Sequence, residues 1–109
     1  MKEFIFPFER LEVWELSIEL AQYVSGVLEK LLQNRHIRLI SQLESAVTSP
    51  AQNISEGKGR QYKKEFIQYL YIAQGSVFEV VTLTEIFRRM NLFSQEDSEE
   101  IRVRCEQIV

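Results

Sequence analysis

Apolar residues recur every three or four positions along almost the whole chain, and this spacing constrains the fold more than any other feature of the sequence. A period of 3.6 residues is typical of an amphipathic helix, whereas a half-buried strand alternates every second residue. The first such segment runs from about Arg10 to Gln33 and carries two neighbouring apolar stripes. Two stripes are wider than one partner helix can cover, so several helices must pack on this segment. Asn34 is a residue type at which a helix often ends.

The second segment is predicted from about Ile37 to Glu56 and contains Pro50. Proline removes one backbone hydrogen bond, so we expect a kink or a break near Ser49. One possibility is a single kinked core helix. The other is a new helix with Ser49 as its N-cap, Pro50 at its first position and Gln52 in a capping box.

Glycines mark one helix end and one helix centre in the next part of the chain. Gly57 and Gly59 are predicted to end the second helix, because glycine tolerates the left-handed conformation found there. A third helical pattern then runs from about Lys63 to Met90. Its centre holds Gly75 and Ser76, and a mid-helix glycine costs about 1 kcal/mol relative to alanine. With Ala73 these residues form a group of small side chains, and the cost is tolerable if another backbone approaches closely there.

A fourth helix is predicted from Gln95, with Ser94 as its N-cap and Asp97 in its first turn. It reaches Val109 without a residue that stops helices, which predicts that the chain as given ends inside this helix; the alternative is an ordinary frayed terminus. We find no strand pattern and no repeat. The fold is predicted to be all-α, an up-down-up-down four-helix bundle with its second helix kinked at Pro50.

Composition limits the class of protein. The 109 residues, 45% of them apolar, fit one domain spanning 1–109. No uninterrupted apolar run reaches the ~18 residues that a membrane span needs, so no membrane association is expected. Residues 1–8 form an apolar N-terminal arm that is too short for a signal peptide. The single cysteine, Cys105, cannot form an internal disulfide, which favours the cytoplasm.

The inventory of reactive side chains argues against an enzyme. The single histidine, His36, lies at a helix start, where a solvated or capping role is expected, and no metal-ligand spacing surrounds it. Cys105 lies in an apolar phase and is expected to behave as a small hydrophobe. Residues 57–60 lack the spacing of a phosphate-binding loop. We expect no cofactor and no metal; the rival hypothesis is a hydrolase or metal enzyme that uses His36 with nearby carboxylates.

Charge is uneven along the chain. The net charge is −3, yet residues 35–64 carry six basic and two acidic side chains. Most of this charge falls in a short basic segment that is a candidate RNA or polyanion site, formed by Lys58, Arg60, Tyr62, Lys63 and Lys64. Cations at a helix N-terminus need compensation. Two kinds of compensation are open. An intramolecular partner, Glu56 or Glu65, could provide it, or a bound polyanion could.

Two further polar residues receive a structural prediction. Asn53 is expected to satisfy carbonyl groups freed by Pro50. An ion pair between Arg60 and a glutamate is expected at an interface, and Glu79 is a second exposed-phase acid on the long helix.

A family resemblance rests on a combined pattern across most of the chain, from about Phe8 to Leu92. The residues that carry it are Trp14, in the opening Phe8-Glu9-Arg10-Leu11-Glu12-Val13-Trp14, Pro50, Asn53, Glu56, Gly57, Gly59, Arg60, Glu65, Phe66, Gly75, Ser76 and Glu79. This pattern resembles the four-helix-bundle proteins encoded in 23S rRNA intervening sequences. Two departures are Ser55, where alanine is common, and the acidic Glu44, where the family often has basic residues.

The resemblance implies a bacterial, homopentameric ring with no agreed biochemical activity. It also implies two kinds of partner: RNA or the ribosome, or a protein, as in a related fold that serves as the accessory protein of a reverse transcriptase. The double apolar stripes and the Phe4–Phe8 arm independently favour oligomerisation. The alternative is that the arm covers its own core.

Overall fold

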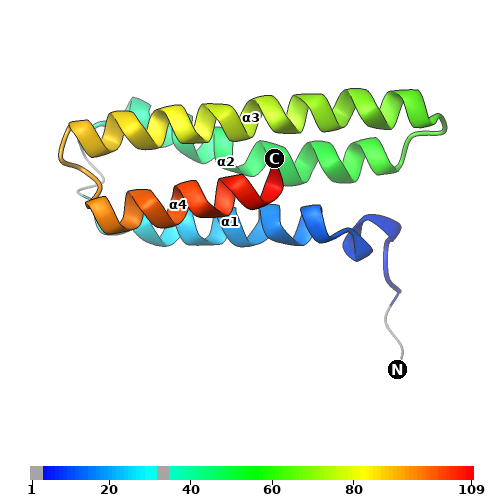
Figure 1. The fold of residues 1–109 in the computed structure, drawn as a ribbon, viewed down its shortest axis with the longest axis horizontal. Coiled ribbons are helices and arrows are strands. Elements are labelled where there is room, and N and C mark those ends of the chain that lie inside the picture. Colours follow the sequence, from blue (N-terminus) through cyan, green and yellow to red (C-terminus); the bar gives the residue numbers. More distant parts are fainter. Residues whose placement is uncertain (1–3, 32–34) are drawn as a thin grey trace.

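The structure is a computed structural model that describes residues 4–31 and 35–109. A short 3₁₀ turn comes first, and four α-helices follow it: η1 (Pro7–Arg10), α1 (Glu12–Leu28), α2 (Ile37–Lys58), α3 (Lys63–Arg89) and α4 (Gln95–Ile108). Successive helices run in opposite directions along the bundle (Figure 1). The predicted all-α, up-down-up-down arrangement is confirmed for the described parts of the chain.

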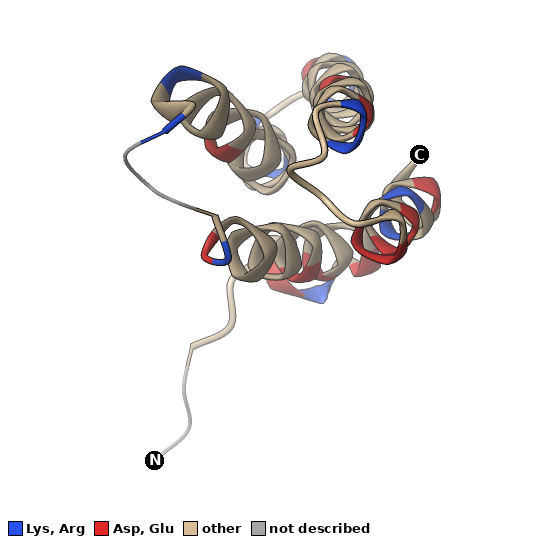
Figure 2. Ribbon diagram, turned by 90° about the vertical axis from the view of Figure 1, so that its left-hand side faces the viewer, with Lys and Arg blue, Asp and Glu red and all other residues tan. Residues whose placement is uncertain are grey.

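The bundle has two layers. Each helix packs on the one before it and the one after it, and α4 also packs on α1. Viewed from one end, α2 and α3 form one layer and α1 and α4 the other (Figure 2). Every helix contributes to one core between the layers, in which the rings of Phe87 and Phe93 lie 4.6 Å apart. The large fully buried side chains include Leu20, Leu43, Ile54, Val77 and Ile101.

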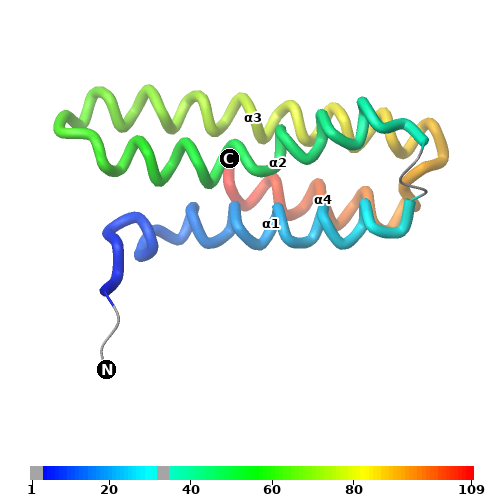
Figure 3. The backbone as a smooth tube through the Cα atoms, turned by 180° about the vertical axis from the view of Figure 1, so that it is seen from behind, coloured from blue at the N-terminus to red at the C-terminus, as the bar shows by residue number. Residues whose placement is uncertain are grey.

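The second helix continues through Pro50. Its axis changes direction near the middle, which Figure 3 shows from behind. The hydroxyl of Thr48 donates to the carbonyl groups of Glu44 and Ser45, each at 3.1 Å. A threonine that donates to the preceding turn bends a helix, so it acts in the same direction as the proline. The predicted kink is confirmed, and the predicted restart is wrong.

Ser49 has a different role from the predicted N-cap. Its hydroxyl lies 2.7 Å from that of Ser76 on α3 and accepts a hydrogen bond from the Asn53 amide at 2.9 Å. The same amide donates to the Ser49 carbonyl at 2.9 Å. Pro50 frees the carbonyl of Ala46, four residues before it, so the bond from Asn53 to the Ser49 carbonyl does not bear out the prediction that Asn53 satisfies a carbonyl freed by the proline. The hydroxyl that a restart requires joins α2 to α3 instead.

Gly57 and Gly59 do not end α2 in the left-handed conformation. No glycine in the described ranges has a positive φ, and Gly57 lies inside the helix. A Cβ atom added at Gly57 would overlap the Cβ of Tyr69 and lie 3.1 Å from the Cδ1 of Phe66. The glycine is needed because α2 and α3 approach closely there.

Two other residues adopt the left-handed conformation. Asn91, with φ of 61°, follows the end of α3, where the amide of Leu92 donates to the carbonyl of Phe87. The amide of Asn91 donates to the carbonyl of Arg88, and the two bonds together form a Schellman motif. His36, with φ of 54°, directly precedes α2. Its side chain is exposed and makes no capping hydrogen bond, so of the two predicted roles the solvated one is observed.

The C-terminal end of α1 and the N-terminal end of α4 lie side by side at one end of the bundle. The first helix ends at Leu28, earlier than predicted, and the predicted end at Gln33 and Asn34 lies outside the described residues. The predicted cap of α4 is confirmed, because the Ser94 hydroxyl accepts from the amide of Asp97 at 3.0 Å. The Asp97 carboxylate then joins the two helices.

Asp97 accepts from the Tyr23 hydroxyl and from the Lys30 ammonium group, both at 3.1 Å. Burial by itself raises the pKa of Asp97, but the hydrogen bonds from Lys30 and Tyr23 hold it below its ordinary value. The carboxylate is therefore ionised at neutral pH, and it fixes α4 against the end of α1.

Replacing Gly57 by alanine should destabilise the fold. The new methyl group forces α2 away from Tyr69, and overpacking of this kind costs about 1–3 kcal/mol. Gly26 is the matched control because a Cβ added there meets nothing within 4 Å. Gly26→Ala should be neutral or stabilise by up to about 1 kcal/mol. Urea unfolding followed by circular dichroism, at one protein concentration, compares them; equal effects would contradict this role of Gly57.

Candidate functional site

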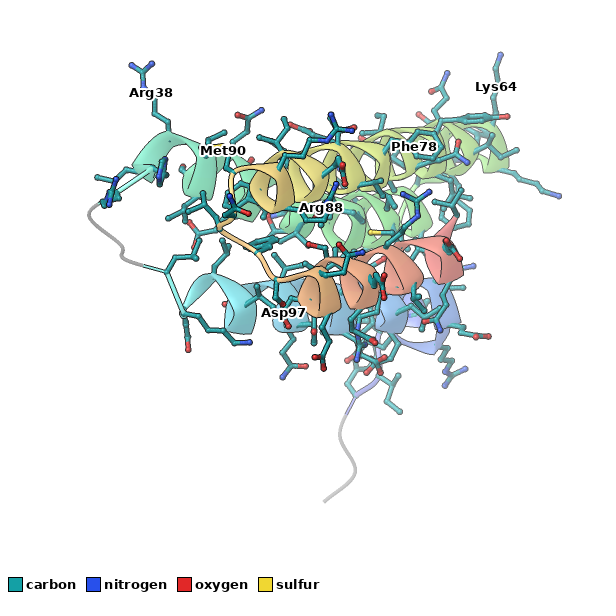
Figure 4. All side chains as sticks on the ribbon, turned by 60° about the vertical axis from the view of Figure 1, so that its left-hand side comes forward. Arg38, Lys64, Phe78, Arg88, Met90 and Asp97 are labelled. Carbon is teal, nitrogen blue, oxygen red and sulfur yellow. The ribbon has the colours of Figure 1, made fainter. Side chains whose placement is uncertain are left out.

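The predicted basic segment lies at the end of the bundle where α2 connects to α3. All five side chains that the sequence singled out are exposed: Lys58, Arg60, Tyr62, Lys63 and Lys64. Figure 4 shows Lys64 at this end and Arg38 near the opposite end. The structure thus gathers the predicted residues on one accessible surface.

Two of these cations lie against aromatic rings of α3. The Lys58 ammonium group is 5.6 Å from the centre of the Phe66 ring, and the Arg60 guanidinium is 5.0 Å from that of Tyr69. Arg60 Nη2 also donates to the Tyr69 hydroxyl at 2.5 Å. These contacts hold the connection against α3. Within one chain Arg60 contacts Tyr69, and its predicted pairing with a glutamate at an interface stays a prediction.

The other two cations have no acidic partner. In the described ranges no ion pair joins Lys63 or Lys64 to a carboxylate, and none involves Glu56 or Glu65. An intramolecular partner was one of two explanations for cations at this helix N-terminus. The contacts give it no support, so the charge of both ammonium groups faces solvent beside Tyr62.

A second exposed surface runs along α3, partly beside the C-terminal end of α4. We call it the α3 outer face; it consists of Ile67, Tyr71, Ile72, Gly75, Phe78, Ile86 and Met90, all exposed. Figure 4 labels Phe78 and Met90 along this helix. Tyr71 is 70% exposed and Phe78 53%. Of the three small residues at the centre of α3, Ala73 is buried and Ser76 contacts Ser49 of α2, whereas a Cβ added at Gly75 meets nothing within 4 Å.

By length and composition alone, α3 is also a candidate to cross a membrane. A third of its most apolar window is buried inside the bundle. Core helices of soluble proteins meet the same criterion, so this observation is weak evidence for a span.

The N-terminal arm forms a third surface. Phe4 is 75% exposed, and Ile5 and Phe6 are about as open as Phe78. The arm leaves the bundle on the side of α1, away from α3 (Figure 1). Successive rings touch one another, from Phe4 through Phe6 and Phe8 to Trp14. Only the last two rings are half-buried, so the first part of the arm does not cover its own core.

Charge divides between the layers. Helices α1 and α4 carry eight acidic and two basic residues, whereas α2 and α3 carry five acidic and six basic ones. Figure 2 shows the acidic residues concentrated in the α1 and α4 layer. In the fold, the basic middle of the sequence becomes a difference in charge between two layers.

A groove between α3 and α4 was not foreseen from the sequence. It has a volume of about 370 Å³, and its lining includes Thr84, Arg88, Ser98 and Arg102. The hydroxyls of Thr84 and Ser98 are buried without a hydrogen-bond partner. Each such group costs about 1–3 kcal/mol. The lining contains no cysteine or histidine, so it offers neither a thiol nor an imidazole base.

The described residues offer little to catalysis. Burial raises the pKa of the Cys105 thiol to about 12, so the thiol is protonated at neutral pH and is a poor nucleophile. No group of three potential metal ligands occurs in residues 4–31 and 35–109. Two other motif residues, Glu56 and Glu79, are exposed and form no ion pair within these ranges.

Comparison with known proteins identifies the family. A family model described as 23S rRNA-intervening sequence protein matches residues 9–109. The chain belongs to this family. A crystal structure of a protein of unknown function from the S23 ribosomal protein family of Bacteroides thetaiotaomicron is similar to it. That protein is 27% identical, with a TM-score of 0.77 over 88% of this chain and 90% of the other. No curated protein matches.

Membership of the intervening-sequence family confirms the resemblance seen in the motif residues. It accounts for the helical bundle. It names no ligand and no reaction, so the role of the exposed surfaces is argued below from their chemistry.

Proposed function

We propose that this intervening-sequence protein works by association and not by catalysis, as a homo-oligomeric helical bundle in the cytoplasm. The observation that carries the proposal is the α3 outer face. Its apolar side chains follow one helix and are between 39% and 70% exposed. Monomeric soluble proteins rarely expose large contiguous apolar patches, and such patches mark interaction sites.

The remaining surfaces support the same conclusion. The arm places the Phe4 and Phe6 rings in solvent, and burying a phenylalanine is worth about 1.5–3 kcal/mol. The buried, protonated thiol of Cys105 and the exposed, unpaired side chain of His36 give a catalytic hypothesis no nucleophile–base pair. The resemblance to the family implies five copies arranged in a ring.

Light scattering after size-exclusion chromatography tests this proposal. One chain has a mass of 12.9 kDa, and we expect the purified protein to elute as a single species of about five times that mass. Because the association buries apolar surface, the assembly should persist in high salt. A monomer mass at every concentration would refute the proposal.

We infer a second role for the basic segment, contact with RNA or another polyanion. The specific observation is that Lys63 and Lys64 are exposed at the N-terminus of α3 without an acidic partner, next to the exposed ring of Tyr62. Ammonium groups bind phosphates, and a tyrosine ring stacks on an unpaired base. A ring would repeat this surface in every copy, so weak contacts would add through their effective concentration.

RNA binding should be steep in salt. Binding of single-stranded RNA, measured by fluorescence anisotropy, should weaken with a logarithmic slope of about −0.7 per phosphate contact. Lys63→Ala/Lys64→Ala should lower both the affinity and this slope. These lysines are preferred to Lys58 and Arg60, which pack on rings.

The control is Arg35→Ala/Arg38→Ala, which removes the same charge near the opposite end of the bundle. Equal losses for the two variants would indicate a general charge effect and contradict a site at the basic segment. If the wild-type protein shows no RNA affinity at low salt, the alternative applies. In that case the bundle binds a protein, for example as an accessory subunit of a reverse transcriptase.

A further inference from the structure

Two hydroxyl groups in the groove between α3 and α4 differ from the other hydroxyls of the helices. A serine or threonine inside a helix ordinarily faces solvent or donates to a carbonyl group about one turn earlier. The side chains that donate in this way are Ser17, Thr48, Ser55, Ser76 and Thr82. Thr84 and Ser98 are only 4% and 7% exposed, and within the described residues neither hydroxyl has a hydrogen-bond partner. These two hydroxyls are therefore both unpaired and shielded from bulk water.

The two residues come from facing helices and line the same groove. Thr84 lies on α3 and Ser98 on α4, and Figure 4 shows Arg88, another residue of the lining, between these two helices. The volume of about 370 Å³ falls in the range of small-molecule sites, about 300–1,000 Å³. Among the described residues that line the groove, none belongs to the α3 outer face or to the basic segment. The groove is therefore separate from both of those surfaces.

Neither hydroxyl is needed to fill its place in the bundle. Valine has almost the shape of threonine, and alanine lacks only the oxygen atom of serine, so both would fit without leaving a buried polar group unpaired. Buried unpaired polar groups destabilise a fold and are rare, and proteins carry such costs mainly at functional sites. Two of them in one groove indicate a ligand that supplies the missing hydrogen bonds.

The charges around the groove cancel, which limits the class of ligand. Arg88 donates twice to Glu85, at 3.0 and 2.7 Å, and the amide of Gln95 donates to Glu99 at 2.8 Å. With Arg102, the lining contains two acidic and two basic side chains. A groove without net charge gives no electrostatic preference to a phosphate or to a metal ion. It favours a neutral ligand whose polar groups form hydrogen bonds.

We propose that the groove between α3 and α4 binds a small neutral molecule with several hydroxyl groups, a polyol or a sugar, through Thr84 and Ser98. Hydroxyl groups both donate and accept, so those of the ligand pair with those of the protein in either direction. The two protein oxygens are covered in the free bundle, so the ligand has to displace a side chain of the lining. Arg102 is free to move, because its side chain is 68% exposed and its ion pair with Glu106 is long, at 3.7 Å. This site adds ligand binding to the proposed association and does not depend on it.

The stability of the ligand-free protein tests whether the two hydroxyls are unpaired. Thr84→Val/Ser98→Ala should raise the melting temperature by about 4 °C or more, because it removes two unpaired buried polar groups. Thr82→Val is the matched control, since its hydroxyl lies on the same helix but donates to the carbonyl of Phe78 at 3.0 Å; it should give no such rise. The inference is overturned if the double variant melts at or below the temperature of the wild type, or if the control rises as much.

Binding itself is measured by saturation-transfer NMR on the ligand, which reads the groove whatever the number of copies in the assembly. The probes are glycerol, D-ribose and myo-inositol, with glycerol 3-phosphate as the charged counterpart of glycerol. At least one neutral probe should bind saturably to the wild type and to Thr82→Val, and at least tenfold more weakly to Thr84→Val/Ser98→Ala. The inference is overturned if no neutral probe binds, if the double variant binds as well as the wild type, or if only the phosphate-bearing probe binds.

Discussion

The close approach of α2 to α3 at Gly57 determines how the basic end of this bundle is built. Without a side chain at this position, α2 packs directly on Tyr69 and Phe66. Those two rings then lie where Arg60 and Lys58 cover them. A larger residue at position 57 would move the rings and both cations. The geometry of the α2–α3 connection therefore depends on the absence of a side chain at position 57.

Periodicity was sufficient to predict the helices, because the apolar stripes of a bundle repeat with the helix itself. The period predicted the bounds of α3 and α4 closely, and Pro50 predicted the position of the kink. The roles of the glycines were harder to predict, because glycine is favoured both where φ is positive and where two helices touch. Gly57 was predicted to adopt a positive φ, but it lies where two helices touch. The left-handed residue at the end of α3 is Asn91, a residue type that was a visible signal for such an end.

The interaction surfaces could be predicted only in part. The five residues of the basic segment are close in sequence, so a short connection brings them together. The α3 outer face could not be separated from the core stripe, because both are apolar and follow the same helix. Only the packing of α2 and α4 shows which side of α3 is covered. The exposed position of Gly75 likewise follows from that packing.

The arrangement of charge links these surfaces to association. A net charge of −3 conceals an acidic layer and a layer with basic ends, which the up-down-up-down topology places on opposite sides of the core. The unlike charge of the two layers supports the proposed contact between copies. The exposed motif residues Glu56 and Glu79, which have no ion-pair partner in the described ranges, are available to such a contact.

Hydroxyl-radical footprinting of the assembled wild-type protein tests the central claim most directly. In one isolated bundle Tyr71 and Phe78 are 70% and 53% exposed, and Tyr62, outside the α3 outer face, is 63% exposed. A Gly75→Arg variant, whose long charged side chain has room in this face, provides an unassociated reference. If association covers this face, Tyr71 and Phe78 should be oxidised much more slowly in the wild-type assembly than in this variant, while Tyr62 reacts equally in both. Equal oxidation of Tyr71 and Phe78 in the two proteins would contradict the account.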